Sequence, residues 1–182
     1  MNDEPDEKEW IQRSLEGDPS AFSCLVLRYQ DVAVNLARRI TGSRTDGEDV
    51  AQEAFIRAYR KLHQFDPVRE FRAWLLGITA NLAKNHIRRR TRREDREQVD
   101  PLLQEEQHDR DPRLAALTDA MEALSASERA ILTLKYMEGY SVNDIATILK
   151  IRQSAVKMRL ARAREHLLNH PLFQEENSYE RS

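Results

Sequence analysis

Residues 141–164 read SVNDIATILKIRQSAVKMRLARAR, and their spacing predicts two short amphipathic helices joined by a tight turn. Ser141 can cap the first helix, with Asp144 at the capping-box position, and Ile151 can fill the turn. The apolar positions expected to face inward are Ile145, Ala146, Leu149, Val156, Leu160, Ala163 and Leu167. This pattern is typical of a helix-turn-helix.

The second of these helices has a polar and basic outer face. Recognition helices read bases near their N-terminal half. The outward residues there are Gln153, Ser154, Lys157, Met158 and Ala161. Residues 150–164 also contain six basic residues, including Arg159 and Arg162, and no acidic one, which suits contact with phosphates. The alternative is an amphipathic hairpin whose basic face is merely solvated.

The turn between the two helices departs from the usual pattern. Lys150 occupies the position where glycine is common. If the backbone there is left-handed, a lysine costs about 1 kcal/mol relative to glycine.

The rest of the chain is also helical in its periodicity, because only 5 of its 182 residues are glycine and no useful alternating pattern occurs. Asp18 and Pro19 are typical of an N-cap and a first helical residue, and Gly42 is placed to end that helix. Asp46 can cap a second helix, expected over 46–62. A third helix follows from Phe71, and residues 125–128 (SASE) form a capping box for a helix ending near residue 139. We therefore expect an all-α protein.

The net charge of −2 hides a strongly sorted distribution. Residues 71–93 carry a net charge of +7 and residues 129–167 carry +5, whereas residues 1–70, 94–128 and 168–182 carry −4, −8 and −2. Since screening limits charge interactions to about 8–10 Å at physiological salt, a phosphate backbone would feel a basic block and not the total. The apolar pattern stops near residue 94, and residues 94–112 are acidic and polar, which predicts a flexible interdomain linker.

The third helix has a second basic face. Asn81, Asn85, Arg88 and Arg92 share one side of it, beside Lys84. Asparagines can hydrogen-bond base edges, and arginines can bind phosphate or stack on bases. The preceding loop, residues 63–70, contains an aromatic residue and can hold an unstacked base. A solvated helix end favoured by the helix dipole is the alternative.

The helix over 46–62 has a different outer face, on which Ile56 is an apolar residue beside Asp49, Gln52 and Glu53. This combination suits a protein partner. The acidic residues of its first turns could instead suggest a metal site, although an acidic helix N-terminus is the simpler explanation.

Taken together, these parts resemble an extracytoplasmic-function (ECF) sigma factor of the sigma-70 family over about residues 8–168. The resemblance rests on DGEDVAQEAFIRAYR at 46–60, FRAWL at 71–75 followed by Asn81, LSASER at 124–129, GYS at 139–141 and VKMRLARAR at 156–164. Arg152 occupies the usual Ser-like cap, Val142 a frequent aromatic position, and Met158 a common serine position. These departures bear on the DNA sequence that is read.

The resemblance implies two small helical domains and a non-enzymatic function without cofactor or metal. Sigma region 2 would span 1–93, the flexible acidic linker 94–113, sigma region 4 114–170 and a tail 171–182. Core RNA polymerase would contact Asp49, Gln52, Glu53 and Ile56. The −10 element would be read by Phe65, Arg69, Phe71, Asn81, Lys84, Asn85 and Arg88. The −35 element would be read by Lys135, Gln153, Ser154, Lys157, Met158, Arg159 and Arg162.

Partners and compartment complete these expectations. The partners implied are core RNA polymerase, promoter DNA and an inhibitory anti-sigma factor, which in the family is often membrane-anchored. The single cysteine excludes an intramolecular disulfide, and no apolar run reaches the about 18–20 residues that span a bilayer, so we expect a cytoplasmic protein without membrane insertion. A stand-alone helix-turn-helix regulator is the competing function. A metal-dependent nuclease is a third, which the single-helix spacing of its carboxylates disfavours.

Overall fold

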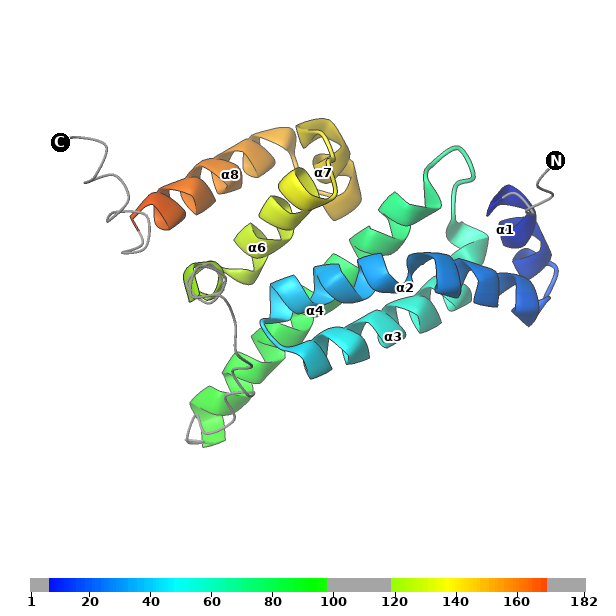
Figure 1. Ribbon diagram of the computed structural model, residues 1–182, viewed down its shortest axis with the longest axis horizontal. Helices are drawn as coiled ribbons and strands as arrows, with labels where there is room; N and C mark the ends of the chain where they lie inside the picture. The colour runs from blue at the N-terminus through cyan, green and yellow to red at the C-terminus, as the bar shows by residue number, and fades with distance from the viewer. Residues whose placement is uncertain (1–6, 98–118, 170–182) are drawn as a thin grey trace.

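The computed structural model describes residues 7–97 and 119–169, and every regular element in these ranges is helical. Figure 1 shows α1–α4 as one group, with α6–α8 lying along one side of it. The elements are α1 (Glu7–Leu15), α2 (Pro19–Thr41), α3 (Arg44–Lys61), the 3₁₀ turn η1 (Leu62–Gln64), α4 (Phe71–Glu97), α6 (Ala126–Leu132), the π-helical η2 (Thr133–Met137), α7 (Val142–Leu149) and α8 (Gln153–Leu168). The expected all-α fold with two helical domains is confirmed.

The N-terminal domain is built on α2, which packs against the antiparallel α3 and against α4, with α1 covering one end. Asp18 caps α2, because its Oδ1 accepts a hydrogen bond of 2.9 Å from the backbone N–H of Ser20. Gly42 ends α2 with a left-handed φ of 77°. Both predicted ends of this helix are confirmed.

The predicted cap of α3 is wrong. Ser43, and not Asp46, is the N-cap: its backbone is extended, and its Oγ accepts a hydrogen bond of 3.2 Å from the N–H of Asp46. Asp46 lies inside the first turn, where its carboxylate joins α3 to α4 through His86 Nε2 and Arg90 Nη1, both at 3.2 Å. Both contacts therefore hold the start of α3 against α4.

Helix α4 runs further than its apolar pattern. It continues to Glu97, past residue 94, where the linker was expected to begin. Most of the predicted linker, from residue 98 to 113, lies outside the described residues, as do Leu114 and Leu117 of the expected next helix.

The C-terminal domain has the two predicted capping boxes. Ser125 and Glu128 cap α6 reciprocally, and Ser141 and Asp144 do the same for α7. The helix from Ser125 ends near Gly139 as expected, but its last part, η2, is π-helical. Lys150 is left-handed, with φ 54° and ψ 47°, so the strained turn is confirmed.

The two domains share one apolar core. Helix α6 packs on α2 and α4, and α7 packs on α4. Ile148 was not among the predicted inward residues, yet it is buried because it contacts α4 at Gly77. This burial comes from domain packing and not from the helix-turn-helix itself.

Candidate functional site

Helix α8 presents the outer face that its sequence predicts. Val156, Leu160 and Ala163 are buried beneath it, which turns the opposite side toward solvent. The exposed residues on the N-terminal half of α8 are Gln153, Ser154, Lys157 and Met158, followed by Arg162 one turn later. The side chain of Arg152 makes no capping hydrogen bond. The predicted base-reading positions are therefore open to a ligand.

Three further basic residues around α8 differ in their surroundings. Arg159 and Lys135 are half-buried. Arg164 is held by Tyr136, whose hydroxyl lies 3.0 Å from its Nε and whose ring centroid lies 5.8 Å from its guanidinium carbon. The sequence reasoning did not single out Tyr136, because the contact joins residues 28 apart that only the domain fold brings together.

Helix α4 carries the second basic face. Asn81, Asn85 and Arg88 are exposed, and Arg88 Nη2 donates to Asn85 Oδ1 at 3.3 Å, so these two side chains act as neighbours. Lys84 is half-buried. Burial lowers its pKa from the usual 10.5, and the positive charge of Arg159 lowers the pKa further. A phosphate placed here would relieve that repulsion.

The loop between η1 and α4 packs on a cluster of aromatic side chains. Phe65 lies 5.6 Å from Phe71 and 5.2 Å from Trp74 between ring centroids. Phe71 is fully buried and Phe65 is 9% exposed, whereas Arg69 is exposed and Val68 is 92% exposed. The structure thus places Phe65 and Phe71 under the loop and Arg69 on its outside.

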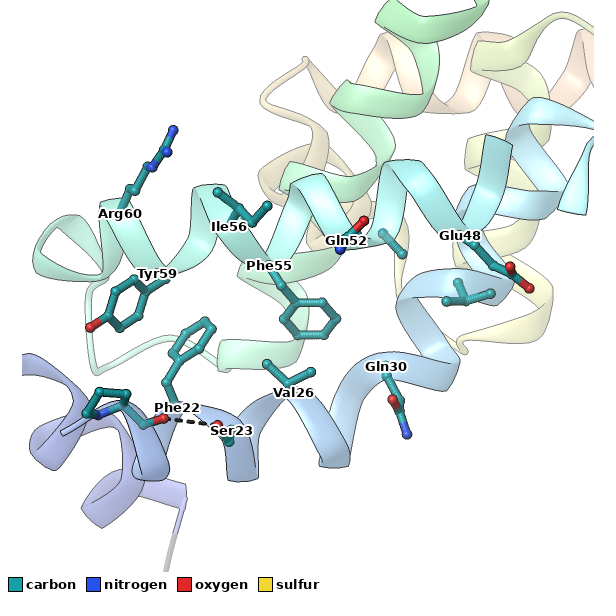
Figure 2. A pocket seen from close by; sticks show the side chains of 13 residues that line it. Phe22, Ser23, Val26, Gln30, Glu48, Gln52, Phe55, Ile56, Tyr59 and Arg60 are labelled. Carbon is teal, nitrogen blue, oxygen red and sulfur yellow. Dashed lines mark hydrogen bonds between the residues drawn. The ribbon is translucent and has the colours of Figure 1, made fainter. Parts of the chain in front are cut away.

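An apolar groove lies between α2 and α3. Figure 2 shows Phe22 and Val26 of α2 opposite Phe55 and Tyr59 of α3. The cavity volume is about 710 Å³. Its lining residues are Pro19, Phe22, Ser23, Val26, Gln30, Val34, Glu48, Ala51, Gln52, Phe55, Ile56, Tyr59 and Arg60. The sequence reasoning missed the contribution of α2, because helical periodicity does not say which helices pair.

The groove contains two of the four residues expected to contact the polymerase. Gln52 and Ile56 line it, and Ile56 is 41% exposed. Asp49 and Glu53 are on the same helix but do not line the groove, and Glu53 pairs with Arg57 at 2.7 Å. The α2–α3 groove is therefore an apolar surface with carboxylates beside it. Among the described side chains, no group of three or more histidine, cysteine, aspartate or glutamate residues is placed to hold a metal ion.

The fold and these faces define a helical DNA-binding protein with a helix-turn-helix. Within the described ranges, no helix combines the length and apolar character needed to cross a bilayer. The family Sigma-70 region 2 matches residues 25–93, and the family Sigma-70, region 4, matches residues 114–167.

Two relatives and two solved structures extend this finding. The RNA polymerase sigma-H factor of Pseudomonas aeruginosa is 37% identical over 87% of this chain and 90% of that protein. The ECF RNA polymerase sigma-E factor of Escherichia coli is 32% identical over 93% and 96%. CnrH, solved in complex with the cytosolic domain of CnrY, is 29% identical with a TM-score of 0.64 over 88% of this chain and 94% of CnrH. The sigma factor RpoE of Bartonella quintana has the same fold, with a TM-score of 0.69 at 23% identity over 84% of this chain and 96% of RpoE.

The chain therefore belongs to the ECF sigma factors of the sigma-70 family. It is a non-enzymatic factor that directs transcription initiation and binds DNA through the helix-turn-helix of region 4.

Proposed function

We propose that this sigma factor binds core RNA polymerase through α3 and the α2–α3 groove, reads the −10 element with α4 and the loop before it, and reads the −35 element with α8. Region 2 then spans 1–93, the linker 94–113, region 4 114–170 and the tail 171–182. The observation that carries the proposal is the exposed basic face of α8, from Gln153 to Arg162, in one chain with a second basic face on α4.

The polymerase contact follows from the chemistry of α3. Ile56 and Tyr59 are large apolar side chains that are 41% and 43% exposed at the edge of a groove. A partner helix that covers this groove buries exposed apolar surface, which favours the complex. The carboxylates of Asp49 and Glu53 can pair with basic groups on that partner. We therefore assign Asp49, Gln52, Glu53 and Ile56 to core polymerase, and we add Phe22 and Tyr59.

The −10 contact uses α4 and its loop. Asn81, Asn85 and Arg88 are exposed for hydrogen bonds to bases and phosphates, and Lys84 adds charge beside them. A base extruded from the duplex costs a few kcal/mol in lost stacking, which a pocket that stacks and hydrogen-bonds it can offset. Arg69 is exposed on the outside of this loop, and we assign it to contact with such a base. Because Phe71 is fully buried, we propose that it supports the loop together with Phe65.

The −35 contact uses the N-terminal half of α8. Gln153, Ser154, Lys157 and Met158 lie where a recognition helix enters the major groove. Arg159 and Arg162 follow on α8, and Lys135 lies in η2, where these cations can bind phosphates. Gln153 Nε2 donates to Asn143 Oδ1 at 2.7 Å, which orients its amide before DNA arrives.

An inhibitory anti-sigma partner and a cytoplasmic location complete the proposal. CnrH, which is 29% identical to this chain, was solved in complex with the cytosolic domain of CnrY, and this complex supports a protein partner of this kind. Promoter DNA and core polymerase are the other partners.

Run-off transcription with purified core polymerase tests the proposal. We expect specific transcripts from genomic promoters only when the factor is added. The variant Asp49→Ala/Glu53→Ala should weaken binding to core, and Lys157→Ala should weaken binding of the holoenzyme to −35 DNA while leaving core binding intact. Specific DNA binding by the factor alone, with no effect of core, would instead support a stand-alone regulator. No factor-dependent transcript from any genomic promoter, with active core and folded protein, would refute the proposal.

A further inference from the structure

The two helices of the helix-turn-helix are joined by a hydrogen bond between two exposed side chains. Asn143 is the second residue of α7, and Gln153 is the first residue of α8. Nε2 of Gln153 donates to Oδ1 of Asn143 at 2.7 Å. Figure 1 shows α7 beside the start of α8, which brings these residues together although they are ten positions apart. The amide of Gln153 is therefore held before any DNA binds.

The same two side chains line a cavity at the turn, together with two cations. The cavity has a volume of about 480 Å³, and Lys150 and Arg152, which are both exposed, also line it. Two positive charges beside exposed amides suit a DNA phosphate. A phosphate oxygen only accepts hydrogen bonds, so it would meet Nδ2 of Asn143 and leave Oδ1 turned toward Gln153.

The groups that remain free on Gln153 decide which base it can read. A glutamine amide has two N–H donors and one carbonyl acceptor, and Asn143 takes one of the donors. The remaining N–H and Oε1 match adenine, whose major-groove edge offers the acceptor N7 and the donor N6. Guanine offers two acceptors there, cytosine only a donor, and thymine only an acceptor beside its methyl group. Adenine is therefore the base that completes both hydrogen bonds.

Asn143 opposes the rearrangement that would change this preference. If the Gln153 amide turned over, Nε2 and Oε1 would exchange places, and Oε1 would face Oδ1 of Asn143 with no proton between the two acceptors. A phosphate bonded to Nδ2 also keeps Asn143 from turning over, because Oδ1 would then face an anion. Asn143 is thus a positioning residue that acts through Gln153, and it couples a contact with the DNA backbone to a contact with a base.

We propose that Asn143 and Gln153 read one adenine of the −35 element as a unit, with Gln153 bonded to the adenine through its two free groups and Asn143 bonded to a neighbouring phosphate. The inference rests on the proposed assignment of α8 to the −35 element. It adds a residue of α7 to those that determine promoter specificity.

Affinities of the holoenzyme for altered promoters test this inference. The probes are labelled promoter duplexes in which each −35 base pair is replaced in turn by the other three, and fluorescence anisotropy measures binding. We expect one position at which adenine is preferred about tenfold, as a bidentate contact predicts. At that position 7-deazaadenine, which lacks the N7 acceptor but still pairs with thymine, should weaken binding at least about threefold.

Variants of the two residues separate base reading from general DNA affinity. Gln153→Ala should abolish the adenine preference at that position alone. Asn143→Ala should reduce the same preference, because the amide is no longer held. Asn143→Asp should restore the preference, since a carboxylate still accepts from Nε2, but it should bind every promoter more weakly because it repels the phosphate. The double alanine variant should show the base profile of Gln153→Ala.

Thr147→Ala is the matched control. Thr147 is exposed one turn further along α7, and its hydroxyl donates to a helix carbonyl at 3.1 Å, so its loss should leave the base profile unchanged. A wild-type profile without an adenine preference, or profiles of Gln153→Ala or Asn143→Ala equal to that of the wild type, would refute the inference even if scrambling the whole −35 element weakens binding. If that scrambling leaves the affinity unchanged, the proposed assignment of α8 fails as well.

Discussion

The carbonyl oxygen of Ile40, near the end of α2, accepts a hydrogen bond of 2.8 Å from Nε of Arg129 on α6. The same guanidinium donates from Nη1 to the carbonyl oxygens of Leu124 at 2.8 Å and Glu122 at 3.1 Å. This buried cation binds backbone carbonyls where helix C-termini leave such acceptors unpaired. One side chain thereby fixes the start of region 4 to region 2.

Replacement of Arg129 by lysine should lower the free energy of unfolding by about 2 kcal/mol or more, because lysine lacks the planar fork that reaches several acceptors at once. Urea denaturation followed by circular dichroism measures the change. Arg152→Lys is the control, since the Arg152 side chain is exposed and makes no capping bond. Equal stability losses in the two variants would contradict the structural role of Arg129.

The turn of the helix-turn-helix offers a stabilising change. Lys150 has φ 54° and ψ 47°, a conformation that glycine adopts without strain. Lys150→Gly should therefore raise the free energy of unfolding by about 1 kcal/mol, whereas Lys150→Ala should not raise it. Thermal denaturation of both variants provides the comparison, and an equal effect of glycine and alanine would show that the left-handed backbone is not the cause.

The apolar groove predicts a specific defect in assembly. Ile56→Asp puts a carboxylate at the partly exposed edge of the groove, where it would have to be desolvated under a partner helix. We expect the affinity for core polymerase to fall at least about tenfold, with little change in folding stability. Fluorescence anisotropy with labelled factor measures this affinity.

Lys61→Ala is the matched control for the groove, because Lys61 ends the same helix and does not line the groove. It should leave the affinity for core unchanged. Loss of binding in the control, or full affinity of Ile56→Asp, would mean that polymerase docks elsewhere.

The cap of α2 predicts a response to acid. Hydrogen bonds from the Ser20 side chain and from Arg13 lower the pKa of Asp18 from 3.8 to about 2. A carboxylate whose pKa is lower in the folded state stabilises the fold above its unfolded pKa, and this contribution is lost as the pH falls through the folded pKa. The loss for Asp18 should therefore occur between about pH 4 and pH 2.

Asp18→Asn isolates this response, because asparagine can still cap the helix but does not titrate. The stability advantage of the wild type over Asp18→Asn should shrink as the pH is lowered from 4 to 2. Thermal denaturation at a series of pH values measures the difference. An advantage that stays constant over this range would exclude Asp18 as its source.

Local signals in the sequence were sufficient for the helix ends that depend on neighbouring residues. Asp18, Ser125 and Ser141 each cap the helix that was predicted, since the hydrogen-bond partners lie two or three residues away. The cap of α3 was misplaced by three residues, because Asp46 is also a good cap and only the fold shows that it bridges to α4.

Features that depend on packing were not predictable in this way. Ile148 looks like an ordinary position of a short helix, and its burial follows from contact with the other domain at Gly77. Phe65 and Phe71 were expected to contact the −10 element, and their place beneath the loop depends on ring packing that includes Tyr29 of α2. The groove needs α2 beside α3, which periodicity alone does not specify.

The assignment of α4 to the −10 element and of α8 to the −35 element is tested most directly by tethered DNA cleavage. An iron chelate is attached in a Cys24→Ser background at Asn85→Cys on α4 or at Met158→Cys on α8, and each holoenzyme is bound to an end-labelled promoter. We predict cuts near −10 from position 85 and near −35 from position 158, about 25 base pairs or ~85 Å apart. Cuts at the same place from both positions, in the reverse order, or absent while the holoenzyme remains bound, would contradict the assignment.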